Sequence, residues 1–474
     1  MGSNRHYFKR GISYLSRNGI RATVIKGLER IERNRQESGY KPSVCDEKEI
    51  LRQRAVRFEV PYKISILVPV YETDPELLRK TLDSVGEQTY GNWELILADA
   101  SRDDMRRNTV RDFMEDYSLM CKDEFGSVFE KVKYVRLTEN KGISGNTNEA
   151  LSHAKGDYVG LLDHDDLLEP DALFEIMSAI ENDEKKNRDS DKLSRVMAVY
   201  TDEDKISEDG RHLFDPNFKP DFDPVMLLTN NYICHFFVAD ANLAKSVGGF
   251  RPDYDGAQDH DFILRCTEGA SRDRILHVAK VLYHWRSTAG STSENPDAKL
   301  YAYEAGKRAV QDHLKRCGIE AQMTDSPHLG FFVPEYAKLH RSVSNITTEE
   351  NTEFVMILSN ELRPLDATYI EDMMSCMHFP YIGAVTGKII GKDGRIESAG
   401  FSVSSDGART PEYAHLNRHF SGYLHRASID RLTDDFAADC VLVRREAVKE
   451  WSPKIRLFDR YDVYYNPRAV FKRI

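Results

Sequence analysis

The chain has 474 residues, of which 41% are hydrophobic, and its 66 Lys and Arg against 77 Asp and Glu give a net charge of −11. This length allows two or three domains with an ordinary core, and the negative charge argues against a general nucleic-acid binder. Seven cysteines without a CxxC pair fit a reduced protein better than a disulfide framework. No window predicts a transmembrane helix, and the N-terminus lacks the apolar core of a signal peptide, so we expect a cytoplasmic protein.

The N-terminal segment is basic although the whole chain is acidic. The first 35 residues carry nine Lys and Arg against two Glu. Residues 5–36 predict one or two short helices, with apolar side chains on one face at Ile20, Val24, Leu28 and Ile31. A basic amphipathic helix lies on an anionic membrane or packs on its own protein, and we favour peripheral contact with the inner face of the cell membrane. With the polar linker predicted over residues 37–62, this segment spans residues 1–62.

From Lys63 onward, apolar runs alternate with amphipathic stretches. Strands are predicted over residues 64–68, 93–98, 132–137 and from Tyr158, and helices over 76–88, part of 106–129 and 146–154. This alternation predicts an α/β fold with a mostly parallel sheet and helices on both faces. Ligands of such sheets bind beyond the carboxyl ends of the strands. The absence of GxGxxG and GxxxxGK[ST] argues against a dinucleotide fold and a P-loop ATPase.

The strand that starts at Tyr158 ends in a cluster of acids. Asp163, Asp165 and Asp166 follow the apolar run closely, and carboxylates at this spacing repel one another unless a cation lies between them. A turn can aim Asp163 and Asp165 at one point, and such oxygen ligands suit Mg²⁺ or Mn²⁺, which in turn suits a diphosphate. The alternative is an acidic turn that caps the next helix, with Asp165 or Asp166 as N-cap and Pro170 in the first turn.

Four segments in this order resemble the family 2 glycosyltransferases, which have the GT-A fold. They are Ile66–Glu72 (ILVPVYE), Leu97–Ser101 (LADAS), Glu139–Asn148 (ENKGISGNTN) and Leu161–Asp166 (LLDHDD). Five more resemble a subgroup that builds bacterial surface polysaccharides of the O-antigen or rhamnan type. These are residues 199–205, 218–221, 230–232, 256–261 and 283–286. The resemblance covers roughly residues 63–320, so we expect a catalytic GT-A domain over residues 63–325.

The resemblance implies a nucleotide site and a metal site. Tyr71 and Asp99 match residues that bind a uracil-like base, and Asp163 matches the ribose contact. The nucleotide-binding set is Pro69, Tyr71, Glu72, Asp99, Gly142 and Asp163. Asp165 matches the metal ligand of the DXD motif, and His284 matches a His that completes the metal or diphosphate contacts. The implied cofactor is Mn²⁺ or Mg²⁺, held by Asp163, Asp165 and His284.

The resemblance also implies a catalytic base and an acceptor side. Asp259 matches the general base that takes the proton of the acceptor hydroxyl as it attacks the anomeric carbon, which inverts the configuration there. Capping of the helix that follows is the competing role for Asp259. Asp202, Trp285 and Arg286 are expected to face the sugar or the acceptor, although Trp285 equally suits a core position.

A second, shorter copy of the domain follows. Residues 353–361 align with residues 157–165, but Ser359 and Glu361 replace the two aspartates, and the nucleotide-binding half that should precede them is nearly absent. We therefore expect residues 326–474 to form a smaller, degenerate, transferase-like α/β domain. It should bind no nucleotide sugar and serve as a platform for an acceptor or a partner.

These patterns predict a metal-dependent, inverting glycosyltransferase. The donor is a nucleoside-diphosphate sugar, with UDP as the default and dTDP left open. The acceptor is a glycan or a polyprenyl-linked glycan in the synthesis of a bacterial cell-surface polysaccharide. The alternative from another class is a non-catalytic nucleotide- or sugar-binding partner of a synthase complex. A sugar nucleotidyltransferase would need a Gly- and Lys-rich phosphate loop, which the sequence lacks.

Overall fold

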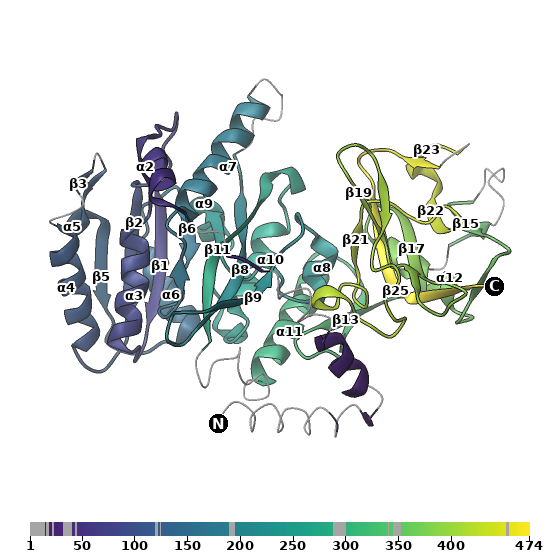
Figure 1. Ribbon diagram of the computed structural model, residues 1–474, viewed down its shortest axis with the longest axis horizontal. Coiled ribbons are helices and arrows are strands. Elements are labelled where there is room, and N and C mark those ends of the chain that lie inside the picture. The colour runs from purple at the N-terminus through teal and green to yellow at the C-terminus, as the bar shows by residue number, and fades with distance from the viewer. Residues whose placement is uncertain are drawn as a thin grey trace. The chain divides into compact units, whose positions relative to one another are not determined.

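The computed structural model (Figure 1) describes residues 15, 19–20, 23–31, 40–42, 45–118, 122–123, 125–188, 195–287, 300–339, 341–344, 352–451 and 455–474. Contacts between residues divide the chain into two compact units. The first unit comprises Tyr40–Phe222 and Asn231–His313, and the second comprises Met1–Gly39, Asp223–Asn230 and Leu314–Ile474.

The first unit is built on a nine-stranded sheet. Its strands are β1 (Ile64–Val70), β2 (Trp93–Asp99), β5 (Val132–Arg136), β6 (Tyr158–Leu161), β7 (Leu167–Leu168), β8 (Ala198–Ser207), β9 (Leu213–Asn217), β10 (Phe237–Asp240) and β11 (Ile275–Ser287). They follow the order β5-β2-β1-β6-β10-β8-β11-β7, and β9 pairs with β8. The pairings from β5 to β6 are parallel, whereas β10 runs antiparallel to both neighbours and β11 is parallel to β8. The predicted α/β class is thus confirmed, with the parallel arrangement confined to the first half of the sheet and to the β8–β11 pair.

Helices connect these strands. They are α2 (Glu47–Ala55), α3 (Pro75–Gly86), α4 (Met105–Ser118), α5 (Val128–Lys131), α6 (Gly142–His153), α7 (Ala172–Asn187), α9 (Ala241–Ser246), α10 (Gln258–Thr267) and α11 (Leu300–Arg316), with the short η1 (Pro252–Tyr254) and η2 (Arg272–Arg274) and the hairpin β3 (Lys122–Asp123) and β4 (Gly126–Ser127). Asp74 begins α3 by accepting hydrogen bonds from the backbone N–H groups of Glu76 and Leu77, which are otherwise unsatisfied at a helix start.

Three sequence-based boundaries differ from the structure. Helix α2 lies inside the stretch predicted as a linker, because Asp46 caps it and buried Gln53 accepts a hydrogen bond from Thr89 at 2.7 Å. Helix α6 begins at Gly142 rather than at residue 146. Strand β1 continues through Pro69 because its pairing with β6 ends at Leu67, so that position borders β2 alone and the missing N–H costs little.

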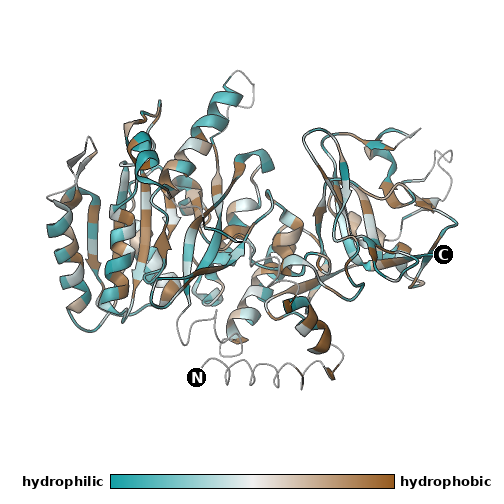
Figure 2. Cartoon of the chain, in the orientation of Figure 1, coloured by the Kyte–Doolittle hydropathy of each residue, from teal (hydrophilic) through white to brown (hydrophobic). Residues whose placement is uncertain are grey.

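The core of the first unit lies where helices pack on the sheet. Fully buried side chains from β1, β2 and β6 meet those of α3, α4 and α7, among them Ile66, Leu78, Leu97, Phe113 and Ile176. Figure 2 shows the same division, with hydrophobic residues along the strands and hydrophilic residues on the outer faces of the helices. This packing holds the strand ends that carry the polar residues described below.

The second unit has an eight-stranded sheet. Its strands are β14 (Val343–Ser344), β15 (Phe354–Leu358), β16 (Leu362–Pro364), β17 (Ile382–Ile390), β18 (Ile396–Ser398), β21 (Arg431–Thr433), β22 (Cys440–Arg444) and β25 (Asp462–Arg473). Smaller elements are the two-stranded pairs β12 (Ala321–Asp325) with β13 (Phe332–Tyr336), β19 (Phe401–Val403) with β20 (Arg409–Pro411) and β23 (Val448–Glu450) with β24 (Arg456–Leu457), the helices α8 (Pro224–Thr229) and α12 (Tyr369–Ser375), and the short η4 (Cys376–His378), η5 (Tyr423–His425) and η6 (Arg445–Ala447). Residues 23–31 are also helical.

The two large sheets share one order of pairing. In the first unit β1, β6, β10, β8, β11 and β7 are neighbours, and in the second unit β14, β15, β22, β17, β25 and β16 are neighbours. The successive pairings are parallel, antiparallel, antiparallel, parallel and antiparallel in both. An extra strand, β9 or β18, pairs antiparallel with β8 or β17. Within the described residues, the second sheet has no counterpart of β2 and β5.

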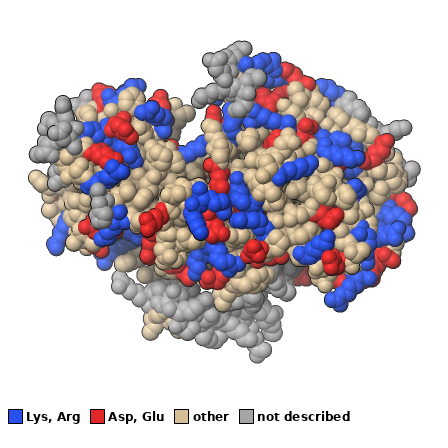
Figure 3. All heavy atoms as spheres, turned by 180° about the vertical axis from the view of Figure 1, so that it is seen from behind, with Lys and Arg blue, Asp and Glu red and all other residues tan. Residues whose placement is uncertain are grey.

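Charges of both signs are mixed at the surface. Figure 3 shows Lys and Arg interspersed with Asp and Glu over the face it presents. Nucleic-acid binders gather Lys and Arg on one face, and this face lacks such a concentration among its described residues. None of the helices that the structure describes combines the length and the apolarity needed to cross a bilayer.

Candidate active site

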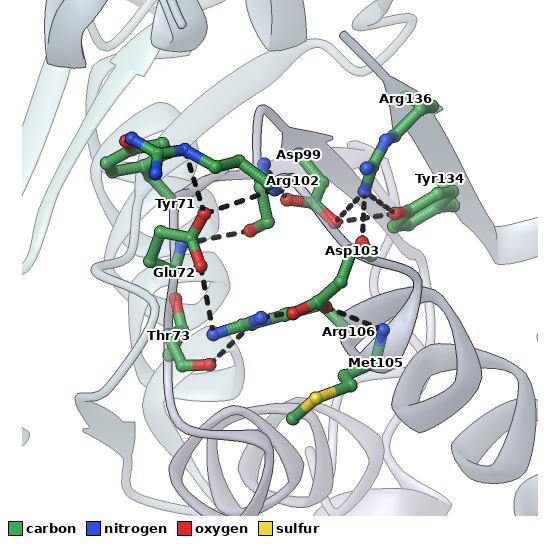
Figure 4. A network of polar contacts seen from close by, with 11 residues as sticks. Tyr71, Glu72, Thr73, Asp99, Arg102, Asp103, Met105, Arg106, Tyr134 and Arg136 are labelled. Carbon is green, nitrogen blue, oxygen red and sulfur yellow. Dashed lines mark hydrogen bonds and ion pairs between the residues drawn. The ribbon is translucent and has the colours of Figure 1, made fainter.

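The carboxyl ends of β1, β2 and β5 carry a closed polar network (Figure 4). Asp99 lies at its centre, with no exposed surface, and accepts hydrogen bonds from the Tyr134 hydroxyl at 2.5 Å, the Ser101 backbone N–H at 2.8 Å and an Arg136 nitrogen at 3.3 Å. Burial, together with the hydrogen bond to the Asp99 carboxylate, raises the pKa of Tyr134 to about 12. Three hydrogen bonds therefore fix the orientation of the Asp99 carboxylate at the strand end where the sequence predicts the nucleotide.

A second acid, Glu72, joins this network to the loop after β1. Its backbone has a φ of 50°, and its N–H donates to the Ser101 hydroxyl at 2.9 Å. Its carboxylate accepts from the Arg102 backbone N–H at 3.1 Å and lies 3.6 Å from a nitrogen of buried Arg106. Glu72 therefore supports the loop. Tyr71 is 36% exposed beside it, so its ring is open to a ligand.

Two further expected nucleotide contacts, Pro69 and Gly142, lie on β1 and at the start of α6. Pro69 pairs with Ala98 in the register of β1 and β2, one residue before Asp99. Gly142 begins α6 with a φ of 76°, and a Cβ at this position would meet the Asp255 carboxylate at 2.5 Å. The α6 helix thus starts close against Asp255, which also accepts from the Ser144 N–H at 3.2 Å. A larger residue at position 142 would disturb this contact.

Beyond β6, the acidic cluster surrounds Tyr283 of β11. The Tyr283 hydroxyl donates to the Asp166 carboxylate at 2.5 Å and accepts from the Asp163 backbone N–H at 3.3 Å. The Tyr283 ring stacks on His235, with the centroids 4.6 Å apart. One buried tyrosine thus organises two acids and a histidine that lie far apart in the sequence.

These three residues form a group that can hold a metal ion. Ligand atoms of Asp163, Asp166 and His235 lie within 4.8 Å of one another. Burial, then repulsion from Asp163 and Asp165, raises the pKa of Asp166 well above its usual range. Burial also raises the pKa of Asp165. A divalent cation would relieve this repulsion. The carboxylate oxygens suit Mn²⁺ or Mg²⁺, and the imidazole suits Mn²⁺ better than Mg²⁺, so the donor set fits Mn²⁺ best.

His284 is placed differently from the expectation that it completes the metal site. Its Nδ1 lies 2.5 Å from Asp204 and its Nε2 3.0 Å from Glu169, so both ring nitrogens are taken. Burial opposes its charge, but hydrogen bonds to both carboxylates prevail and raise its pKa to about 9. A protonated imidazole has no lone pair for a metal. In this arrangement His235, rather than His284, supplies the imidazole near Asp163.

Asp259 lies in the first turn of α10 and does not cap it. The N-cap residue is Ala257, without a side-chain hydrogen bond. The Asp259 carboxylate instead accepts from the Asn231 side-chain amide at 2.8 Å, and the Cys234 thiol lies 3.5 Å away. Its neighbour Asp261 is buried and accepts from Arg265 at 2.8 Å, which is a structural contact. Asp259 therefore points toward the loop of residues 231–236.

That loop also carries His235, so it joins Asp259, the expected base, to the acidic cluster. A buried lysine, Lys219, holds it by donating to the Ile233 carbonyl at 2.6 Å and to the His235 carbonyl. Burial raises the pKa of the Cys234 thiol well above its usual range, and the negative charges of Asp259, Glu203 and Asp163 add to this. The Cys234 thiol therefore lies close enough to both Asp259 and Asp163 for their charges to affect it.

Of the three residues expected on the acceptor side, two lie near the acidic cluster or His235 and one lies elsewhere. Trp285 is half-buried and its ring lies edge-on to His235, at 6.2 Å between centroids. Arg286 is buried beside the acidic cluster, where its Nε donates to the Asp165 carbonyl at 2.6 Å and its backbone N–H to Asp166 at 2.7 Å. The Nη2 of Arg286 has no hydrogen-bond partner in the described part of the chain.

Asp202 is the exception in this set. It is 3% exposed and accepts from the Lys219 backbone N–H at 2.8 Å and lies 2.9 Å from the His277 Nε2. Hydrogen bonds to Asp202 and Asp221 raise the pKa of His277 against the opposing effect of burial. Both contacts are made to Oδ1 of Asp202, and they hold the carboxylate between the Lys219 backbone and the His277 ring.

Sequence reasoning did not single out Asp166 and His235, which the structure places with Asp163 in a group that can hold a metal ion. Asp166 lies in the same acidic cluster as the expected Asp163 and Asp165, so the signal was present but was assigned to its neighbours. His235 follows the 230–232 segment that carries part of the family resemblance, yet nothing in its local sequence distinguishes it. Its position results from stacking on Tyr283, which is a long-range contact.

Comparisons with known proteins show which family the first part of the chain resembles. Residues 65–212 match the family model described as Glycosyl transferase family 2. This range contains β1, β2, β5, β6 and the acidic cluster that follows β6. The chain therefore carries a family 2 glycosyltransferase domain.

Two relatives extend along most of the chain. "Uncharacterized protein y4gI" of Sinorhizobium fredii is 30% identical over 81% of this chain and 48% of its own length. The O-antigen biosynthesis protein RfbC of Myxococcus xanthus is 26% identical over 81% of this chain and 34% of its own length. The chain thus spans half or less of the length of these relatives. Among solved structures, S. aureus TarS 1–349 in complex with UDP matches with 19% identity and a TM-score of 0.38, over 53% of this chain and 65% of that one.

Proposed function

We propose that the first unit is a metal-dependent, inverting glycosyltransferase that takes its sugar from a nucleoside-diphosphate sugar. The observation that carries this proposal is the convergence of Asp163, Asp166 and His235 within 4.8 Å. The loop that carries His235 also contacts Asp259 through Asn231. The proposed catalytic domain spans residues 63–325.

The strand-end network is the proposed nucleotide site. Buried Asp99 has lone pairs beyond those used by its protein donors, so it can accept from the N–H of a uracil-like base. Exposed Tyr71 offers an aromatic face to the same base. UDP is the expected nucleotide, and dTDP presents the same N–H. The partly unpaired guanidinium of Arg286 can meet the diphosphate.

The chemistry then needs a charge for the leaving group and a base for the acceptor. A divalent cation held by Asp163, Asp166 and His235 would neutralise the diphosphate. The Asp259 carboxylate would take the proton of the acceptor hydroxyl as that oxygen bonds to the anomeric carbon and the bond from this carbon to the diphosphate oxygen breaks. A single displacement of this kind inverts the configuration. Asn231 would orient Asp259 throughout.

The proposed acceptor is a glycan or a polyprenyl-linked glycan of a bacterial cell-surface polysaccharide. The relative named as an O-antigen biosynthesis protein supports this class of acceptor. A lipid-linked acceptor requires access to the membrane. Residues 23–31 form a helix in which Glu29 contacts the Ser421 hydroxyl at 2.9 Å, while Ile20, Val24, Leu28 and Ile31 are each at least half exposed. We propose that this apolar face lies on the inner surface of the cytoplasmic membrane.

Release of nucleoside diphosphate from a panel of UDP- and dTDP-sugars tests the proposal. We expect release with Mn²⁺ or Mg²⁺ and its loss with EDTA. Asp163→Asn should abolish release, whereas Asp112→Asn, a surface carboxylate on α4, should leave it unchanged. Absence of release, together with unchanged nucleotide binding, would instead favour the alternative function of a non-catalytic binding partner.

A further inference from the structure

The repeated sheet topology allows positions in the two units to be matched residue by residue. In each sheet, three residues face one another across three neighbouring strands. These trios are Gly160, Val238 and Val199 on β6, β10 and β8, and Met356, Leu442 and Val385 on β15, β22 and β17. Counting along the strands from these trios gives the counterparts of the site residues in the second unit.

The proposed metal ligands have no equivalent donors there. The counterparts of Asp163, Asp166 and His235 are Ser359, Leu362 and Asp439 respectively. The pairing of β7 with β11 and that of β16 with β25 give the same match for Asp166. A leucine and a serine cannot replace two carboxylates around a hard cation.

A guanidinium supplies the positive charge at this position instead. Arg473, at the end of β25, donates to Asp439 at 2.8 Å and to Glu397 at 3.0 Å, and lies 3.8 Å from Glu361. It holds these acids in place and neutralises part of their charge. The three carboxylates, which could otherwise attract a cation, thus already lie near the Arg473 guanidinium.

The element that carries the proposed base is also missing. Residues 241–274 separate β10 from β11 and include α10 with Asp259, whereas only residues 445–461 separate β22 from β25. Their described part forms η6, β23 and β24 and no helix like α10. In its described residues, the second unit therefore has no counterpart of the proposed metal ligands or of the helix that carries the proposed base.

A pocket nevertheless remains at this end of the second sheet. It has a volume of about 270 Å³ and is lined by residues of β17, β18, β19 and β20 and by the chain before β22. Its lining includes Glu397, Ser398, Phe401, Arg409, Pro411 and Asp439. Glu397 and Asp439 are the two acids that Arg473 holds, and Asp439 is the counterpart of His235.

We propose that this pocket binds one neutral sugar residue of a glycan chain without metal or nucleotide. Glu397 and Asp439 accept hydrogen bonds only, so they suit hydroxyl donors. Phe401 and Pro411 supply apolar surface, and the Arg409 guanidinium lies 4.9 Å over the Phe401 ring. Pockets of about 300–1,000 Å³ hold drug-sized ligands, so 270 Å³ suits a single sugar better than a nucleotide sugar. This binding does not depend on the proposed transferase activity.

Saturation-transfer NMR on the full chain tests the proposal. The probes are the methyl glycosides of rhamnose, glucose, galactose and N-acetylglucosamine at millimolar concentration, with EDTA present and nucleotide absent. We expect a saturation-transfer signal from at least one glycoside, and we expect the Phe401→Ala variant to lose this signal. Phe458→Ala changes an exposed phenylalanine of the same unit outside the pocket and should keep the signal. The isosteric Asp439→Asn variant, which preserves the shape of the pocket, should weaken binding at least several-fold.

Two outcomes would overturn this assignment. One is that no glycoside in the panel gives a saturation-transfer signal. The other is a saturation-transfer signal that persists in both Phe401→Ala and Asp439→Asn but disappears in Tyr71→Ala. This result would place the sugar in the first unit. Failure of the transferase proposal would show separately, as the absence of diphosphate release with metal present.

Discussion

The side-chain amide of Asn231 lies 2.8 Å from the Asp259 carboxylate and donates a hydrogen bond to it. This contact connects the first turn of α10 to the loop that ends at His235. The proposed base and the proposed metal site are therefore held by one short segment, and Lys219 anchors this segment from inside the protein. A change in the loop is expected to affect both the proposed base and the proposed metal site.

The first prediction concerns Asp259. Asp259→Asn should lower kcat by roughly 10²–10⁴, the usual share of general base catalysis, while the Kd of the donor nucleotide stays the same. Asn231→Ala should lower kcat by a smaller factor, because the base remains but loses its orientation. Steady-state kinetics with calorimetric nucleotide binding measure both effects, and Asn108→Ala on the surface of α4 is the control. A loss of nucleotide affinity at unchanged kcat would identify Asp259 as structural.

The second prediction separates the two histidines. His235→Ala should raise the Mn²⁺ concentration needed for half-maximal activity by roughly ten-fold or more, because it removes a ligand from the group with Asp163 and Asp166. His284→Gln should change this concentration less, since its imidazole is bound by Asp204 and Glu169. The reverse ranking, obtained from Mn²⁺ titrations of both variants, would restore His284 as the metal ligand.

The third prediction concerns the charge of His284. Its pKa in the folded protein is raised from 6.5 to about 9, so the folded state holds a proton that the unfolded state loses in this interval. The stabilisation is complete below pH 6.5 and is lost as the pH rises through about 9; it amounts to at most about 3 kcal/mol. NMR of the imidazole C–H signals, assigned with His284→Gln, should therefore show a midpoint near pH 9. A midpoint near 6.5 would contradict the two ion pairs.

The sequence predicts the framework of the first unit well. The starts of β1, β2 and β5 agree with the expected residues because each strand is a short apolar run bounded by polar residues. The acidic strand end was likewise evident from Asp163 to Asp166. Local pattern gave no indication of the His235 position, of the ion pairs of His284 or of buried Asp202, because each depends on residues that meet only in the folded sheet. Helix α2 was missed because few of its residues are apolar.

The fourth prediction concerns the N-terminal helix. The full chain should bind vesicles that contain anionic lipid, and added salt should weaken this binding because Lys and Arg contribute to it. Replacing exposed Val24 and Leu28 together by Ser should reduce binding strongly, whereas Leu51→Ser, at an equally exposed position on α2, should not. Vesicle co-sedimentation measures this. Equal binding of both variants would mean that the apolar face of the N-terminal helix does not contact lipid.

The fifth prediction is that the second unit binds no nucleotide. Calorimetric titration of UDP with Mn²⁺ into the Asp163→Ala/Asp165→Ala double variant should give no metal-dependent binding. The wild-type chain, titrated in the same way, should show one site.

This expectation follows from charge and topology. Arg473 already pairs with Glu397 and Asp439, so a second cation would meet its repulsion before reaching these acids. In its described residues the second sheet also lacks the strands that correspond to β2 and β5, and in the first unit β2 supplies Asp99 and β5 supplies Tyr134 to the nucleotide side. Without them no strand ends remain to hold a base. Metal-dependent UDP binding that persists in the double variant and weakens further on Asp439→Asn would show instead that the second unit is a working nucleotide site.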